Sequence, residues 1–109
     1  MLSYFVRYRG ASPDPGAFGT YYETRHAEIL KQFPNIRSLI LHSPAPWTDP
    51  FPVQRGETML LAQMQFDSAG DLDQALRSEA RRLARDDFQL FPPFDGEVTH
   101  EAMTGKVIF

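Results

Sequence analysis

Residues 2–26 have the sequence LSYFVRYRGASPDPGAFGTYYETRH, in which the spacing of apolar side chains changes from two residues to about 3.6. One side of the first part consists of Leu2, Tyr4, Val6 and Tyr8. This alternation of aromatic and aliphatic residues predicts a strand over residues 2–9. Asp14 followed by a proline is typical of a helix start, and Pro34 is typical of a helix end. The stretch therefore predicts one strand followed by a helix over residues 15–32.

Two further strands are predicted in the middle of the chain, over residues 36–43 and 57–66. The second has an apolar face that consists of Leu60, Ala62, Met64 and Phe66. A proline-rich connection over residues 44–56 separates them and contains the single tryptophan, Trp47. Because long connections inside compact domains are often functional, we expect this one to be a lid or an interface arm.

The last part of the chain predicts a second helix and a fourth strand. Ser68, with an acidic residue three positions later, resembles a capping box, and Ser78 has the character of a second cap. We therefore expect a kinked or split helix over residues 69–91. Residues 97–103 are predicted as the last strand, and the apolar tail at 105–109 is expected to be held in place, on a second subunit for example.

The order strand, helix, strand, strand, helix, strand predicts the fold class. It indicates a single α+β domain over residues 1–109, a ferredoxin-like βαββαβ sandwich with a four-stranded antiparallel sheet and both helices on one face. The other face is then uncovered, and its expected occupants are Phe5 or Tyr4, Leu39 or Ile40, and Leu61. Such a face is too apolar for water, so we expect a homodimer through paired sheet faces.

Composition excludes several classes of partner. The net charge of −3 argues against nucleic acid, and no stretch approaches the ~20 apolar residues of a membrane span. The segment ARRLAR (80–85) is basic, but Asp86 and Asp87 follow it, so we interpret it as a solvated helix surface. The absence of cysteine excludes disulfides and thiolate metal sites. We expect a cytoplasmic protein with neither a nucleic-acid nor a membrane partner.

Several short motifs resemble those of the EthD family, which belongs to the dimeric α+β barrels. They are F-x-x-Y-Y-x-x-x-H (Phe18, Tyr21, Tyr22, His26), Pro34, S-A-G-D-L-x-x-A-L-x-S (68–78), an aspartate at Asp86 or Asp87, and F-x-x-F-D (91–95). The resemblance implies a protomer whose sheet pairs with that of its partner to form a barrel. It also implies a cleft between sheet and helices for a small, largely apolar molecule, without a cofactor. Relatives in the superfamily isomerise lactones, cyclise or oxidise polyketides, or degrade haem, so the fold does not fix the reaction.

His26 is the main candidate for chemistry. It lies on a helical stripe that consists of Phe18, Tyr22, His26, Ile29 and Phe33. An imidazole in this stripe is either a hydrogen-bonded core residue or the wall of a pocket, where it can act as general acid or base near neutral pH. Tyr22, one turn earlier, is either a core residue or the partner that orients the imidazole or a ligand oxygen.

Four further residues are candidates for ligand binding. Phe18 and Ile29 share the stripe of His26 and are expected to contact the ligand. Arg25 lies at the edge of the stripe, where it clamps a carboxylate or forms a surface ion pair with Glu28 or Glu23. Trp47 either closes over the ligand or anchors a dimer.

The other two histidines, His42 and His100, are predicted on strands. No pair of histidines has a ligand spacing such as H-x-x-x-H, and no glycine pattern of a nucleophile elbow surrounds a serine, so we expect no metal site and no serine triad. Two hypotheses stay open. One is a cofactor-independent enzyme that isomerises, decarboxylates or assists oxidation of a small molecule, with His26 as acid/base. The other is a non-catalytic carrier or accessory protein of an oxidative degradation system.

Overall fold

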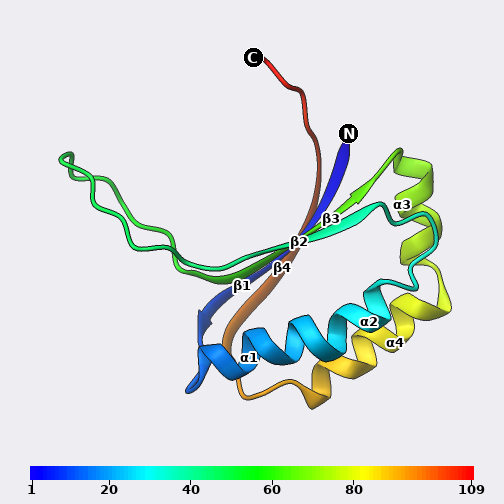
Figure 1. The fold of residues 1–109 in the computed structure, drawn as a ribbon, viewed down its shortest axis with the longest axis horizontal. Helices are drawn as coiled ribbons and strands as arrows, with labels where there is room; N and C mark the ends of the chain where they lie inside the picture. The colour runs from blue at the N-terminus through cyan, green and yellow to red at the C-terminus, as the bar shows by residue number, and fades with distance from the viewer.

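The computed structural model describes residues 1–109, and it shows a four-stranded sheet with all helices packed on one face (Figure 1). The strands are β1 (Leu2–Ala11), β2 (Ser38–His42), β3 (Thr58–Phe66) and β4 (Asp95–Thr104). They lie in the order β2-β3-β1-β4, and every neighbouring pair is antiparallel. This is the predicted ferredoxin-like βαββαβ arrangement, and the fold class is confirmed.

Two helical segments cover the sheet. The first consists of α1 (Pro15–Tyr21), a π-helical turn η1 (Tyr22–His26) and α2 (Ala27–Leu30), which follow one another without a break. The second consists of α3 (Ala69–Leu76), α4 (Glu79–Asp87) and a 3₁₀ turn η2 (Phe88–Leu90). The predicted split in the second helix is confirmed, and β4 begins two residues earlier than the sequence indicated.

The helix starts have the caps that the sequence predicted. The side chain of Asp14 accepts a hydrogen bond from the backbone N–H of Ala17 at 3.0 Å, which satisfies one of the free donors at the start of α1. Ser68 caps α3 in the same way, with its Oγ 3.1 Å from the N–H of Asp71. Ser78 caps α4, and this second cap is the local cause of the split.

The core lies between the sheet and the helices. Tyr4, Val6 and Tyr8 of β1 and the alternate residues Leu60, Ala62, Met64 and Phe66 of β3 point toward the helices and are buried. The most completely buried large side chains are Phe18, Tyr22 and Phe66. The alternation predicted for these two strands is therefore confirmed.

The open face of the sheet is less apolar than the sequence indicated. Alternation places Phe5, Ile40 and Leu61 on it, whereas Tyr4 and Leu39 pack against the core. Polar side chains, among them Ser3, Gln63 and His42, occupy other positions of the same face. Gln63 donates to Ser3 Oγ at 3.1 Å, and its Oε1 lies 2.9 Å from Nε2 of His42. Phe5, Ile40 and Leu61 are therefore on the open face, as predicted, with polar side chains between them.

Two segments project from the body of the molecule (Figure 1). One is the arm between β2 and β3, which carries the exposed side chains of Trp47, Phe51 and Val53. The other is the tail after β4, in which Val107, Ile108 and Phe109 are exposed. Neither segment packs on the core of its own chain. None of the helices has the length and apolar character needed to cross a membrane.

Candidate functional site

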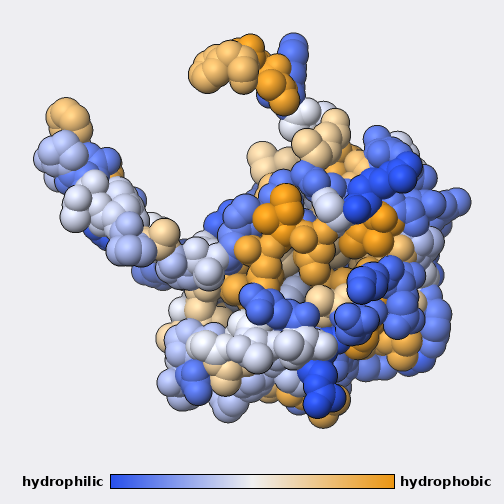
Figure 2. Space-filling view, viewed as in Figure 1, coloured by the Kyte–Doolittle hydropathy of each residue, from blue (hydrophilic) through white to orange (hydrophobic).

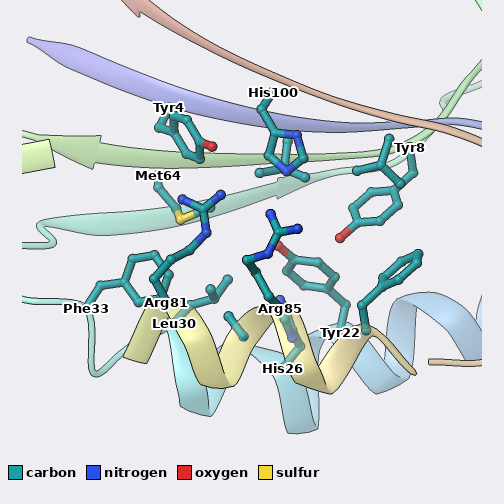
Figure 3. A pocket seen from close by; sticks show the side chains of 14 residues that line it. Tyr4, Tyr8, Tyr22, His26, Leu30, Phe33, Met64, Arg81, Arg85 and His100 are labelled. Carbon is teal, nitrogen blue, oxygen red and sulfur yellow. The ribbon is translucent and has the colours of Figure 1, made fainter. Parts of the chain in front are cut away.

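A cavity of about 200 Å³ lies between the sheet and the helices, and its lining is mainly hydrophobic. Figure 2 shows the apolar surface of the hollow between the two layers, with hydrophilic side chains at its edge. The lining side chains used below are Tyr4, Tyr8 and His100 from the sheet and Tyr22, His26, Arg81 and Arg85 from the helices (Figure 3). Its volume is below the roughly 300–1,000 Å³ typical of pockets for drug-sized ligands, so it suits a small molecule.

His26 is held in place by a carboxylate from the other helical segment. Its Nδ1 lies 2.8 Å from Oδ2 of Asp87, and the second oxygen, Oδ1, accepts a hydrogen bond from the hydroxyl of Tyr21 at 2.8 Å. The side chains of His26 and Asp87 are only 7% and 10% exposed. Because a carboxylate can only accept, the proton of the neutral imidazole lies on Nδ1.

The π-helical turn explains how two residues five positions apart reach one carboxylate. In a regular α-helix, Tyr21 and His26 would lie about 140° apart around the axis. In η1 the N–H of Ala27 bonds instead to the carbonyl of Tyr22, five residues earlier, which widens the turn. Both side chains then face Asp87. The wider turn also shifts the buried stripe, so that Leu30 is buried and Ile29 only partly so.

The second ring nitrogen of His26, Nε2, is open to the cavity. This nitrogen has no hydrogen-bond partner in the chain. Every side-chain nitrogen or oxygen atom that is itself buried does have a partner, so Nε2 is not a buried atom. An unpartnered nitrogen in a buried residue that lines a cavity is therefore one that solvent or a ligand can reach. With Nδ1 protonated, Nε2 presents its lone pair to that space.

Burial lowers the pKa of His26 below its ordinary value, because the cavity wall disfavours the imidazolium. The hydrogen bond and the negative charge of Asp87 act in the opposite direction without cancelling the effect of burial. The ring is therefore neutral at pH 7, the state in which Nε2 accepts a proton. Its contacts with the edge of Tyr22 and with Phe91, at centroid distances of 4.8 and 4.7 Å, fix its orientation.

Two tyrosines provide further polar groups in the apolar lining. Burial raises the pKa of Tyr22 and that of Tyr8 far above their ordinary value, and the neighbouring Tyr8 adds to the effect on Tyr22. Both hydroxyls therefore stay protonated and can donate to a ligand oxygen. Figure 3 shows them directed toward the interior of the cavity.

The structure brings together only the two predicted catalytic residues, His26 and Tyr22. Phe18 is fully buried in the core and Ile29 is half-buried, and neither lines the cavity. Arg25 is exposed and forms no ion pair with Glu23 or Glu28, and Glu28 pairs with Lys31 instead. Trp47 lies in the arm, where the guanidinium of Arg55 stacks 4.2 Å from its ring centroid. A ligand-binding role for these four stays a prediction.

Sequence reasoning missed Asp87 and Tyr21 as site residues, although both belong to the motifs that carried the family resemblance. The basic segment 80–85 is solvated at Arg82 and Arg85, as interpreted, but sequence reasoning did not show that Arg81 and Arg85 also lie at the edge of the cavity. A helical projection of the segment separates Arg82 from the other two, because residues four apart share a face.

The histidines do not gather at one place. His42 lies on the open face of the sheet beside Gln63, and His100 lies at the cavity but apart from His26. The chain contains no group of three or more His, Asp or Glu side chains arranged to hold a metal ion.

Comparison with solved structures identifies several proteins with the same architecture. No protein-family model and no curated protein sequence matches the chain. An EthD family protein from Bacillus halodurans superposes with a TM-score of 0.72 at 18% identity, over 97% of this chain and 100% of that one.

Two oxygen-using enzymes have similar structures. The monooxygenase of the gene ActVA-Orf6 from Streptomyces coelicolor, solved with nanaomycin D, has a TM-score of 0.68 at 14% identity, over 99% of this chain and 89% of that one. SnoaB, a cofactor-independent oxygenase from Streptomyces nogalater, has a TM-score of 0.63 at 11% identity, over 97% of this chain and 93% of that one. The chain therefore has the fold of EthD family proteins, and the resemblance that its motifs indicated is confirmed at the level of the fold.

Proposed function

We propose that the chain binds a small, largely apolar organic molecule in the cavity and that His26 exchanges a proton with it, in a catabolic or biosynthetic pathway. One observation carries this proposal. His26 is fixed through Nδ1 by Asp87 at 2.8 Å, while its Nε2 is unpartnered at the wall of a mainly hydrophobic cavity. A neutral imidazole, oriented by a buried carboxylate and open on the other side, is a competent general base.

The chemistry follows from the positions of the side chains. Nε2 of His26 removes a proton from a carbon activated by a neighbouring carbonyl or phenol oxygen, and Asp87 stabilises the imidazolium that forms. The hydroxyl of Tyr22 donates to the oxygen on which negative charge develops. Return of the proton to another carbon gives isomerisation. In the oxidative branch dioxygen is the oxidant: the carbanion adds to it with formation of a C–O bond, and the peroxide anion that results takes the proton from the imidazolium of His26 to give a hydroperoxide. The similarity in fold to SnoaB, a cofactor-independent oxygenase, and to the ActVA-Orf6 monooxygenase supports the oxidative branch.

A non-catalytic carrier or accessory protein of an oxidative degradation system is the second candidate. The cavity supports it equally, because an apolar lining with a few donors also suits simple binding. In that case Nε2 of His26 accepts a hydrogen bond from the ligand and no carbon–hydrogen bond is broken.

Exchange with heavy water separates the two candidates. Cyclic ketones, lactones and hydroquinones are first screened for binding by ligand-observed NMR, and each binder is then incubated with the protein in D₂O. The enzyme predicts deuterium at an acidic carbon of the binder. The variant His26→Asn keeps a donor for Asp87 but has no titratable nitrogen, so it should bind without exchange. Binding without exchange by the unsubstituted protein would favour the carrier.

We also infer that the chain forms a homodimer through its open sheet face. Support comes from the apolar side chains Phe5, Ile40 and Leu61 on that face and from the exposed apolar groups of the arm and the tail (Figure 2). Sedimentation equilibrium at micromolar concentration should give twice the chain mass of 12.5 kDa. A species of 12.5 kDa alone would contradict the pairing of sheets.

A further inference from the structure

Helix α4 presents two arginines to the cavity without a partner for either charge. Arg81 and Arg85, one turn apart, line the cavity, and neither guanidinium forms an ion pair. Arg82, between them in sequence, points away and pairs with Glu79 and, at 2.9 Å, with Asp86. The helix thus neutralises Arg82 and leaves the half-buried Arg81 and the exposed Arg85 without an ion pair at the edge of the cavity.

The two acidic residues that follow these arginines in α4 are already engaged. Asp86 is engaged by Arg82, and Asp87 by His26 and Tyr21. Figure 3 shows both guanidinium groups reaching from α4 toward the strands that carry Tyr4 and His100. The carbon at the centre of the Arg81 guanidinium lies 6.0 Å from the centroid of the Tyr4 ring.

The positive charges of Arg81 and Arg85 also act on His100. Its ring centroid lies 6.0 Å from that of Tyr4, at the sheet side of the cavity. Burial lowers its pKa, and the charges of Arg81 and Arg85 lower it further. An anion between the two arginines would relieve their mutual repulsion, which disfavours like charges at this spacing on a helix.

We propose that the mouth of the cavity is a carboxylate-binding site formed by Arg81 and Arg85, and that the ligand is a small aromatic or alicyclic acid. This inference rests on the proposed function, since it names the class of molecule that the same cavity takes. Guanidinium groups suit a carboxylate because two parallel N–H groups match its two oxygens. The apolar body of the acid would then occupy the hydrophobic part of the cavity near Tyr22 and His26.

The test uses benzoate and benzamide, which have nearly the same shape but differ in charge. Their dissociation constants for the full chain are measured by NMR titration, with the unsubstituted protein and three variants. Arg81→Gln and Arg85→Gln each remove one charge at the cavity. Arg82→Gln removes the same charge from the same helix on its solvent side and is the matched control.

Benzoate should bind at least about tenfold more tightly than benzamide, the difference expected for a charge-assisted hydrogen bond. Arg81→Gln and Arg85→Gln should weaken benzoate by about tenfold and leave benzamide unchanged, and Arg82→Gln should change neither. Equal binding of the two probes by the unsubstituted protein, or an equal loss in Arg82→Gln, would overturn the carboxylate site and leave the cavity proposal standing. Binding of neither probe at millimolar concentration would contradict both.

Discussion

Nδ1 of His26 and Oδ2 of Asp87 lie 2.8 Å apart although 61 positions separate them in the chain. His26 ends the π-helical turn of the first helical segment, and Asp87 ends α4 of the second. The hydrogen bond therefore joins the two βα halves of the fold at the cavity. The other nitrogen of the imidazole has no partner in the chain, and His26 lines the cavity, as the proposed function requires.

Asp87→Asn should lower the pKa of His26 further. The negative charge of Asp87 favours the imidazolium, and only burial would act on the ring once that charge is gone. The ring resonances of His26, followed by NMR against pH, measure the shift. Asp86→Asn is the control, because Asp86 is exposed and pairs with Arg82. A His26 titration that is the same in both variants would show that Asp87 does not tune the imidazole.

Tyr21→Phe removes one of the two hydrogen bonds of the Asp87 carboxylate. The free energy of unfolding should fall by about 1 kcal/mol, the net contribution of a typical hydrogen bond. The pKa of His26 should rise, because a carboxylate with one donor fewer favours the imidazolium more strongly. Urea unfolding and the same NMR titration measure the two effects. A lower His26 pKa in this variant would contradict the shared role of Asp87.

The fold could be predicted from the sequence because its local signals agree with one another. The alternation of Tyr4, Val6 and Tyr8 is confirmed by their burial, and each predicted serine cap accepts the expected backbone hydrogen bond. These signals depend on residues close in sequence. They determine the elements, and the order of the elements leaves few topologies.

The site could be predicted only in part, because it depends on contacts between distant elements. His26 was found since an imidazole in an apolar stripe is unusual. Asp87 could not be assigned to it, because no local pattern shows that the end of α4 meets the π-helical turn. A helical stripe drawn with 3.6 residues per turn cannot show a π-helical turn. This turn moved the buried position from Ile29 to Leu30.

Acid should destabilise the fold through His26. The pKa of its imidazole is lower in the folded protein than in the unfolded chain, so below pH ~6.5 the unfolded chain binds more protons. The stabilisation is complete above that pH and is lost as the pH falls toward the folded pKa. Urea unfolding between about pH 8 and pH 5 measures it. His100 contributes in the same direction, so the comparison is between the unsubstituted protein, His26→Asn and His100→Asn.

The difference between these three proteins isolates each histidine. The free energy of unfolding of His26→Asn should depend less on pH than that of the unsubstituted protein, because position 26 no longer titrates. That of His100→Asn should also depend less on pH. Identical slopes in the unsubstituted protein and His26→Asn would contradict a depressed pKa for His26 in the folded state.

Phe18→Ala should destabilise the fold by about 3–5 kcal/mol, as expected for loss of a buried aromatic side chain. Phe18 is 0% exposed and contacts Tyr8 and Phe91 edge to face. Phe51→Ala, in the arm, is the control, since Phe51 is 74% exposed and should change the stability of the single chain little. Similar losses in the two variants by urea unfolding would show that the arm is part of the folded core.

Gly10→Ala and Gly96→Ala should each destabilise the fold by at least about 2 kcal/mol. The two glycines face each other in the pairing of β1 with β4, and their φ values of +142° and +158° are unfavourable for other residues. A methyl group on Gly10 would collide with the carbonyl oxygen of Asp95, and one on Gly96 with that of Arg9.

Gly19→Ala is the matched control for these two substitutions. Gly19 lies in α1 with no atom within 4 Å of the position that a methyl group would take. Alanine there should stabilise the chain by about 0.5–1 kcal/mol, because glycine is a poor helix former. Urea unfolding of the three variants gives the comparison. A loss of stability in Gly19→Ala equal to that in Gly10→Ala would contradict the close strand approach as the cause, since only Gly10 and Gly96 lie at such an approach.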